Sequence, residues 1–209
     1  MLHSYNQNVS YTIRKVAEAE FPTRWGRFRL MGFEGHNDSD RRIETAVALV
    51  TGDLTSRPPL VRIHSQCLTG DVFGSLRCDC RQQLEMSLAL IAAEGVGVLV
   101  YEQQEGRGIG LMAKIQAYEL QDRGMDTVEA NEKLGFKADQ REFALPAGIL
   151  KELGLREVRL LSNNPDKVQA IEASGVKVVE RVPCEVEPHT DSEAYLKTKK
   201  EKMGHLFSR

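Results

Sequence analysis

Strand-like and helix-like segments alternate along the chain from Arg81 to Val179, and this alternation restricts the possible folds more than any other feature. Leu84, Leu88 and Ile91, for example, recur at the spacing of one helix face. The expected helices span 81–94, 109–123, 147–153 and 165–174, and the expected strands span 96–101, 158–161 and 176–179. Strands joined through helices are connected by right-handed crossovers, so we expect a mostly parallel sheet with flanking helices.

The first third of the chain lacks this alternation. Short apolar or alternating runs at 28–33, 46–51 and 60–64 are bounded by glycine, aspartate and proline, which predicts strands without intervening helices. The expected fold class is therefore α/β: a single domain with a mixed, mostly parallel sheet, flanking helices and an antiparallel N-terminal part. We place this domain at residues 14–209, after a loose, polar N-terminal extension at 1–13.

The charge and hydropathy of the chain exclude some classes of partner. With a net charge of −2, the chain has no global field to attract nucleic acid or an anionic membrane. The longest apolar runs, such as 96–101, are too short to span a bilayer, and the N-terminus lacks the apolar segment of a secretory signal. We therefore expect a cytoplasmic protein without nucleic-acid or membrane partners, in which any anionic ligand binds to a local cluster of cations.

Three of the four cysteines, Cys67, Cys78 and Cys80, lie close together in the sequence. Three thiols favour a metal ion with one open coordination position, as in catalytic zinc sites; zinc suits soft sulfur ligands, and iron is the alternative. Cys80 starts a predicted helix, whose partial positive charge favours deprotonation of Cys78 and Cys80. Packing as reduced apolar groups remains possible, but charged neighbours disfavour it. Such clustering indicates metal binding in a reducing compartment.

A glycine-rich turn, Gln104-Glu-Gly-Arg-Gly-Ile-Gly110, lies between a predicted strand and a predicted helix. Its glycines permit close backbone approach, and the helix start offers free N–H groups to an anion. Arg107 adds a planar group that can bind phosphate through two hydrogen bonds. The turn matches neither a Walker A motif nor a Rossmann fingerprint, and a glycine-rich turn is more often only a turn.

Two further segments carry polar groups. In Ser162-Asn-Asn-Pro-Asp-Lys167, an asparagine can cap a helix that begins at the proline, and Lys167 then opposes the helix dipole. A bound anion would explain that lysine, although a capped helix with a surface lysine explains the segment equally well. Asp139 and Arg141 are two residues apart and by themselves predict no more than a surface ion pair.

An ordered set of short stretches runs through nearly the whole chain, from about residue 14 to residue 206. They are Val16-Ala-Glu-Ala, Arg62-Ile-His-Ser-Gln-Cys-Leu-Thr-Gly-Asp, Ser75-Leu-Arg-Cys-Asp-Cys, Gln104-Glu-Gly-Arg-Gly-Ile-Gly-Leu, Asp126-Thr-Val-Glu-Ala-Asn, Leu134-Gly-Phe, Ser162-Asn-Asn-Pro and Lys202-Met-Gly-His. Together they resemble the GTP cyclohydrolase II family, which catalyses the first step of riboflavin biosynthesis, in its stand-alone form.

The resemblance implies hydrolysis of GTP to 2,5-diamino-6-ribosylamino-4(3H)-pyrimidinone 5′-phosphate, formate and pyrophosphate. It implies one zinc ion per subunit on Cys67, Cys78 and Cys80, magnesium with the GTP triphosphate, and a homodimer. Zinc would activate water near neutral pH for attack at C8 of the purine.

The resemblance also implies roles for individual side chains. It implies Asp139 as proton acceptor, Arg141 as nucleophile toward the α-phosphate, and Tyr118 as a catalytic tyrosine. Because a guanidinium stays protonated in proteins, an electrostatic role of Arg141 at the α-phosphate fits the chemistry better. The expected GTP contacts are Arg62, Ile63, His64, Ser65, Gln66, Gln83, Glu105, Gly106, Arg107, Thr127, Ser162 and Lys167.

The sequence departs from the family pattern at three positions. Gln66 stands where a glutamate is expected, Gln103 where arginine is common, and Ser162 where threonine is usual. These changes bear on substrate affinity and rate rather than on the reaction class. Cys184 matches no family role and is expected to be structural.

Two other classes of zinc protein are alternatives to this function. A zinc nucleobase deaminase requires His-x-Glu and Pro-Cys-x-x-Cys, but the only Pro-Cys pair, Pro183-Cys184, is not followed by a second cysteine at that spacing. A zinc-stabilised nucleotide-binding module without turnover would instead require a fourth protein ligand that closes the metal site.

Overall fold

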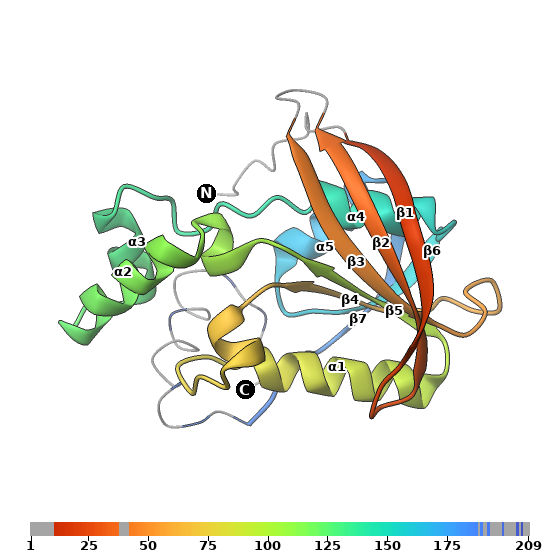
Figure 1. The fold of residues 1–209 in the computed structure, drawn as a ribbon, viewed down its shortest axis with the longest axis horizontal. Helices are drawn as coiled ribbons and strands as arrows, with labels where there is room; N and C mark the ends of the chain where they lie inside the picture. The colour runs from red at the N-terminus through yellow and green to blue at the C-terminus, as the bar shows by residue number, and fades with distance from the viewer. Residues whose placement is uncertain are drawn as a thin grey trace. The chain divides into compact units, whose positions relative to one another are not determined.

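The computed structural model describes residues 11–37, 42–187, 189, 192, 198, 204 and 206, and these residues form two compact units (Figure 1). Unit 1 comprises Met1–His64, Met86–Gln103 and Phe143–Cys184 within the described ranges. Unit 2 comprises Ser65–Glu85, Gln104–Glu142 and Glu185–Arg209 within the same limits. Each unit is therefore assembled from segments that are distant in sequence.

Unit 1 is built on a sheet of the seven strands found in the described ranges, in the order β1-β2-β3-β5-β4-β6-β7. The strands are β1 (Tyr11–Pro22), β2 (Arg27–Asn37), β3 (Ile43–Thr51), β4 (Leu60–Ser65), β5 (Gly97–Glu102), β6 (Glu157–Leu161) and β7 (Lys177–Val182). Neighbours among β1, β2, β3 and β5 are antiparallel, whereas β6 is parallel to both β4 and β7.

Helices cover both faces of this sheet (Figure 1). Val98 and Val100 of β5 belong to a buried cluster with residues of α4 (Ala144–Glu152) and α5 (Pro165–Ala173). Successive strand residues point to opposite faces, so Gly97 faces the other way. A Cβ at Gly97 would lie 2.9 Å from Ile91 of α1 (Cys80–Glu94), which places this part of α1 on the opposite face.

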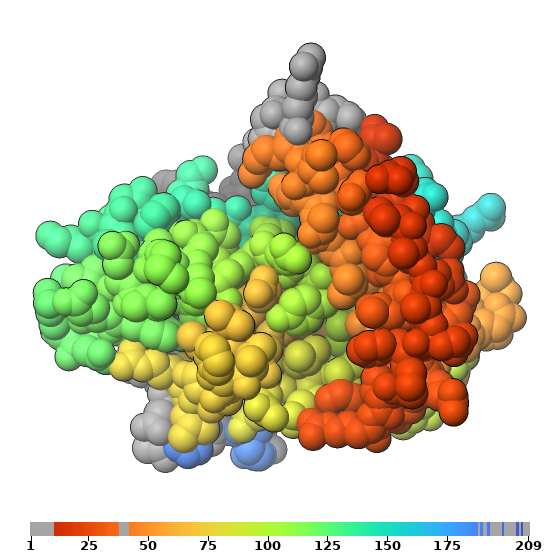
Figure 2. All heavy atoms as spheres, viewed as in Figure 1, coloured from red at the N-terminus to blue at the C-terminus, as the bar shows by residue number. Residues whose placement is uncertain are grey.

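The structure confirms the α/β class, the mixed sheet, the flanking helices and the antiparallel N-terminal part. The sheet is not mostly parallel as expected: its antiparallel part is larger, because β5 pairs antiparallel with β3 and because β1 was not predicted. Most β1 side chains are exposed at the surface of unit 1, so they lack the apolar alternation that marks a half-buried strand (Figure 2). Residues 11–13, assigned to a loose extension, begin β1, and residues 1–10 lie outside the described ranges.

Unit 2 contains short helical elements and turns. They are the π-helical turn η1 (Leu68–Val72), the 3₁₀ turn η2 (Glu105–Gly108), α2 (Leu111–Asp122), α3 (Thr127–Lys133) and the first turn of α1. A capping box starts α3: the Asp126 carboxylate accepts from Val128 N and Glu129 N, and the Glu129 carboxylate accepts from Asp126 N. Within the described ranges, every helix is too short or too polar to traverse a bilayer.

Candidate active site

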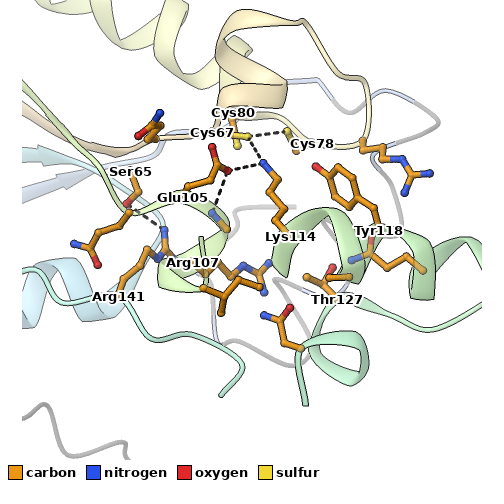
Figure 3. Close-up of a pocket in the computed structure, with 18 residues that line it drawn as sticks. Ser65, Cys67, Cys78, Cys80, Glu105, Arg107, Lys114, Tyr118, Thr127 and Arg141 are labelled. Atoms are coloured by element: carbon orange, nitrogen blue, oxygen red, sulfur yellow. Dashed lines mark hydrogen bonds and ion pairs between the residues drawn. The ribbon is translucent and has the colours of Figure 1, made fainter. Parts of the chain in front are cut away.

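The three predicted ligand cysteines come together in unit 2 (Figure 3). Their Sγ atoms all lie within 4.8 Å of one another; Cys67 directly precedes η1, and Cys80 begins α1. The Sγ atoms of Cys67 and Cys78 are 3.7 Å apart. Two sulfurs bound tetrahedrally to one zinc ion, at about 2.3 Å each, would be separated by about 3.8 Å. The geometry therefore fits a zinc ion.

Gly70 makes room for this cluster. A Cβ at this position would lie 2.9 Å from Cys78 Sγ and 3.1 Å from Cys67 Sγ, closer than side chains normally approach. Among the described residues, the cluster contains three candidate ligands and no fourth cysteine, histidine, aspartate or glutamate. The three thiols fit the open type of zinc site, in which one coordination position is left for water or substrate.

The proximity of the three thiols shifts their pKa values in opposite directions. Hydrogen bonds from Cys78 and Cys80 lower the pKa of Cys67, whereas the hydrogen bond to Cys67 raises the pKa of Cys78 to about 11. Hydrogen bonds to both other cysteines, together with burial, raise the pKa of Cys80. Contrary to the expectation from the helix start, Cys78 and Cys80 stay protonated without metal, because the Cys67 thiolate opposes a second negative charge nearby.

A buried lysine that the sequence analysis missed contacts this cluster. Lys114 lies in the first turn of α2. Its ammonium donates to Cys67 Sγ at 3.2 Å and to Glu105 Oε1 at 2.7 Å (Figure 3). It also donates to Thr69 Oγ1 at 2.9 Å. Burial alone would lower the pKa of Lys114, but the negative charge of Cys67 and the hydrogen bond to Glu105 outweigh it and raise this pKa. Lys114 therefore remains a cation at the site.

Tyr118 lines the same cavity as the cysteines, one helical turn after Lys114. Its hydroxyl oxygen is 3.2 Å from Thr69 Oγ1, and the guanidinium carbon of Arg77 lies 4.8 Å from the centre of its ring. Burial raises the pKa of Tyr118, so the phenol keeps its proton near neutral pH. The residue predicted from the family pattern thus lines the same cavity as the thiol cluster and carries its phenolic proton.

The glycine-rich turn packs against the segment that carries Arg141. Gly106 and Arg107 have left-handed backbones with φ of 62° and 63°, and Arg107 is the one non-glycine residue with positive φ in the described ranges. A Cβ at Gly108 would lie 3.1 Å from the carbonyl carbon of Gln140, whose N–H donates to Arg107 O at 3.0 Å. This contact holds the strained residue in place, and Arg107 lines the cavity.

Asp139 and Arg141 form a largely buried ion pair, not the surface pair that their spacing alone predicts. Arg141 Nη2 donates to Asp139 Oδ2 at 2.5 Å and Nε donates to Oδ1 at 3.0 Å, while Nη1 donates to Ser65 Oγ at 3.3 Å. Burial alone would raise the pKa of Asp139, but the charge and hydrogen bonds of Arg141 lower it overall. Arg141 lines the cavity and Asp139 does not.

The other predicted GTP contacts of unit 2 divide into two groups. Gln83 is not among the residues that line the cavity, and its amide donates to Asp79 Oδ2 at 2.5 Å. The remaining ones do line the cavity: Ser65, Gln66, Glu105, Gly106, Arg107 and Thr127.

The remaining predicted contacts belong to unit 1: Arg62, Ile63, His64, Ser162 and Lys167. Arg62 Nη1 donates to Leu161 O at 3.0 Å, and Lys167 Nζ donates to Ile63 O at 3.0 Å. Lys167 is 4% exposed and lies 5.0 Å from the centre of the Phe143 ring, so it is not the surface lysine that a plain capped helix would carry. These residues therefore group at the carboxyl ends of β4 and β6 and at the start of α5.

An α/β protein whose cavity combines three thiols placed to hold a metal with a protonated phenol and several arginines has the features of a metalloenzyme for an anionic substrate. A family model described as GTP cyclohydrolase II matches residues 14–183. The chain therefore belongs to the GTP cyclohydrolase II family, as the sequence motifs predicted, and it is an enzyme.

Two sequence relatives agree with this assignment. The chain is 55% identical over 194 residues to GTP cyclohydrolase-2 of Buchnera aphidicola subsp. Acyrthosiphon pisum, covering 92% of this chain and 98% of that protein. It is 51% identical over 208 residues to the riboflavin biosynthesis protein RibBA of Chlorobium phaeovibrioides, covering 99% of this chain but only 50% of that relative. A solved structure of RibBX, a two-domain 3,4-dihydroxy-2-butanone 4-phosphate synthase from A. baumannii, matches 88% of this chain and 43% of its own, at 18% identity and a TM-score of 0.47.

Proposed function

We propose that this chain catalyses the zinc-dependent hydrolysis of GTP to 2,5-diamino-6-ribosylamino-4(3H)-pyrimidinone 5′-phosphate, formate and pyrophosphate, the first step of riboflavin biosynthesis. The observation that carries the proposal is the three-cysteine cluster, which opens onto the same cavity as Tyr118 and Arg107 in a member of this family. The proposal includes one zinc ion per subunit, magnesium with the triphosphate, a homodimer and a cytoplasmic location, all of which rest on the family resemblance.

Zinc held by Cys67, Cys78 and Cys80 would supply activated water for attack at C8 of the purine. Tyr118 has the role of proton donor to the opening imidazole ring, because burial keeps its phenol protonated and its hydroxyl lies in the cavity. Thr69 holds that hydroxyl at 3.2 Å and so orients it toward the substrate position.

At the phosphate end, Arg107 and Arg141 supply positive charge within the cavity. We assign Arg141 an electrostatic role at the α-phosphate, because its guanidinium is ionised and already fixed by Asp139 and Ser65. While it remains paired with Arg141, Asp139 is a weak base, since the pair lowers its pKa. The contacts expected from Arg62, Ile63, His64, Ser162 and Lys167 remain predictions of the family resemblance.

The central experiment incubates the protein with GTP and magnesium and measures formate, pyrophosphate and the pyrimidinone separately. Cys78→Ser and Cys80→Ser should each abolish formate release and lower the zinc content, because each removes one of three ligands. Cys184→Ala, which changes a buried cysteine outside the cluster, is the matched control and should keep both. A cysteine variant that lacks zinc and still forms formate at the wild-type rate would contradict the proposal.

The same experiment tests the alternative of a binding module. If the wild-type protein binds zinc and GTP but releases neither formate nor pyrophosphate, the chain is a zinc-stabilised nucleotide-binding module and the proposed reaction is wrong.

A further inference from the structure

We propose that Lys114 is a positioning residue that, together with Thr69, fixes the three-cysteine site relative to Tyr118. The part of this inference that concerns Tyr118 rests on the proposed function, whereas the part that concerns zinc binding does not. Neither Lys114 nor Thr69 lies among the residues expected to touch GTP.

The hydrogen bonds of Lys114 all go to groups of the protein, although its side chain also lines the cavity. A lysine ammonium has three N–H groups, and all three are used within the protein, on Cys67 Sγ, Thr69 Oγ1 and Glu105 Oε1. The side chain is 11% exposed, so the geometry is held by surrounding atoms and not by solvent. No donor is left for a phosphate or a base, and the ammonium therefore acts through the groups that it holds.

Charge explains why a cation is needed at this position. A divalent zinc ion with three thiolate ligands carries a formal charge of 2 − 3 = −1. The buried Glu105 carboxylate, which accepts a hydrogen bond from the Lys114 ammonium, adds a further negative charge beside the zinc and its thiolates. Without the cation, two like charges would face one another in a buried site, which disfavours both the bound metal and the observed position of Glu105.

The same ammonium reaches Tyr118 through Thr69. Lys114 occupies one acceptor position of the Thr69 hydroxyl, and the Tyr118 hydroxyl lies 3.2 Å from the same oxygen. Lys114 and Tyr118 are four residues apart on α2, so they lie on one face of the helix, and the ammonium is 5.6 Å from the centre of the phenol ring. The helix α2 thus fixes Lys114 relative to Tyr118, and the hydrogen bond from Lys114 to Cys67 connects both to the cysteine cluster.

The first test measures the affinity of metal-stripped, full-length protein for zinc alone, in competition with a chromophoric chelator. Lys114→Met removes the charge at similar length, and it should weaken zinc binding by about 10- to 100-fold, the usual effect of losing a partner of a metal ligand. Lys114→Arg should recover most of this loss. Lys133→Met, which removes an exposed lysine of α3, is the matched control and should bind zinc like the wild type. Wild-type zinc affinity in Lys114→Met would overturn the proposal.

The second test isolates Thr69 and remains informative if Lys114→Met does not fold, which circular dichroism would show. Thr69→Val keeps the shape but deletes the hydroxyl, so kcat for formate should fall at least tenfold while KM for GTP stays within threefold. Thr69→Ser should restore kcat. An unchanged kcat in Thr69→Val would overturn the link to Tyr118. Absence of formate from zinc-loaded wild-type protein would instead overturn the proposed function and leave the result on zinc affinity intact.

Discussion

At the scale of single residues, the buried pair of Asp139 and Arg141 has the clearest energetic consequence. Because Arg141 lowers the pKa of Asp139, the ionised carboxylate is more stable in the folded protein than in the unfolded chain. The stability that this provides is fully present above the pKa of an unfolded aspartate, about 3.9, and is lost as the pH falls through the lower pKa of the folded protein.

Asp139→Asn should therefore reduce the free energy of unfolding at neutral pH, and the difference from the wild type should shrink in acid, below roughly pH 4. Urea unfolding over this pH range checks the sign. Asp122→Asn breaks an exposed aspartate–arginine pair and should cost about 0–1 kcal/mol, with little dependence on pH. An Asp139→Asn deficit of equal size at acid and neutral pH would show that the pair contributes through shape and not through charge.

Single residues also show the limit of what the sequence alone can predict. The three cysteines were found from their close spacing in the sequence, and Tyr118 was found from the family resemblance. Lys114 was missed because a lysine on an amphipathic helix normally marks the solvent face, and only the folded contacts with Cys67 and Glu105 reveal that it is buried.

At the scale of elements, the glycine-rich turn combines two requirements that substitutions can separate. Gly108 and Gly110 both have left-handed backbones, with φ of 89° and 84°. A Cβ at Gly108 would press on Gln140 at 3.1 Å, whereas a Cβ at Gly110 would meet nothing within 4 Å. A substitution at either position would therefore strain the backbone, whereas only a substitution at Gly108 would also displace the segment that carries Arg141.

Gly110→Ala should lower stability by roughly 1–3 kcal/mol, the cost of holding alanine in a backbone conformation (φ 84°, ψ 167°) that is essentially confined to glycine, and leave pyrophosphate release nearly unchanged. Gly108→Ala should lower stability further and also reduce pyrophosphate release, because Arg141 moves with its neighbour Gln140. Urea unfolding of both variants measures the loss of stability, and a pyrophosphate assay measures the effect on pyrophosphate release. Equal rates of pyrophosphate release in the two variants would contradict the proposed use of Arg141.

Helices and strands could be predicted from the sequence where burial of one face produces a regular spacing of apolar residues. The strands at the centre of the sheet and the helix α1 were found in this way, whereas α5 was predicted from its capping Asn164 and from Pro165 at its first position. By contrast, α3 is only seven residues long, too short for a helical period to be recognised, and most side chains of β1 are exposed.

At the scale of the whole molecule, the two compact units could not be predicted, because each is assembled from segments that interleave along the chain. The family was predictable, because its motifs are short, specific and ordered, and the match to residues 14–183 confirms it. The proposed reaction has two hydrolytic parts, ring opening and pyrophosphate release, and the groups assigned to them are different.

Removal of zinc should therefore abolish formate release but leave part of the pyrophosphate release, with GMP as the product. Tyr118→Phe should have the same selective effect, since it deletes the phenolic proton beside the cysteine cluster. Formate, pyrophosphate and GMP are measured from the same samples. If pyrophosphate release falls in step with formate in both, a substrate whose ring is already opened distinguishes an obligatory order of steps from a wrong assignment of the groups.

The spacing of the three thiols also bears on oxidation. Without metal, the Cys67 thiolate lies 3.7 Å from the Cys78 sulfur, so a peroxide that oxidised Cys67 to a sulfenic acid would place that group beside a thiol able to condense with it. A metal bound at the cluster would then protect the thiols in addition to supplying chemistry, because it would occupy the sulfur that reacts first. Zinc-binding measurements on metal-stripped protein therefore require a reductant. Without one, a lower capacity to bind zinc would reflect disulfide formation and not weakened affinity.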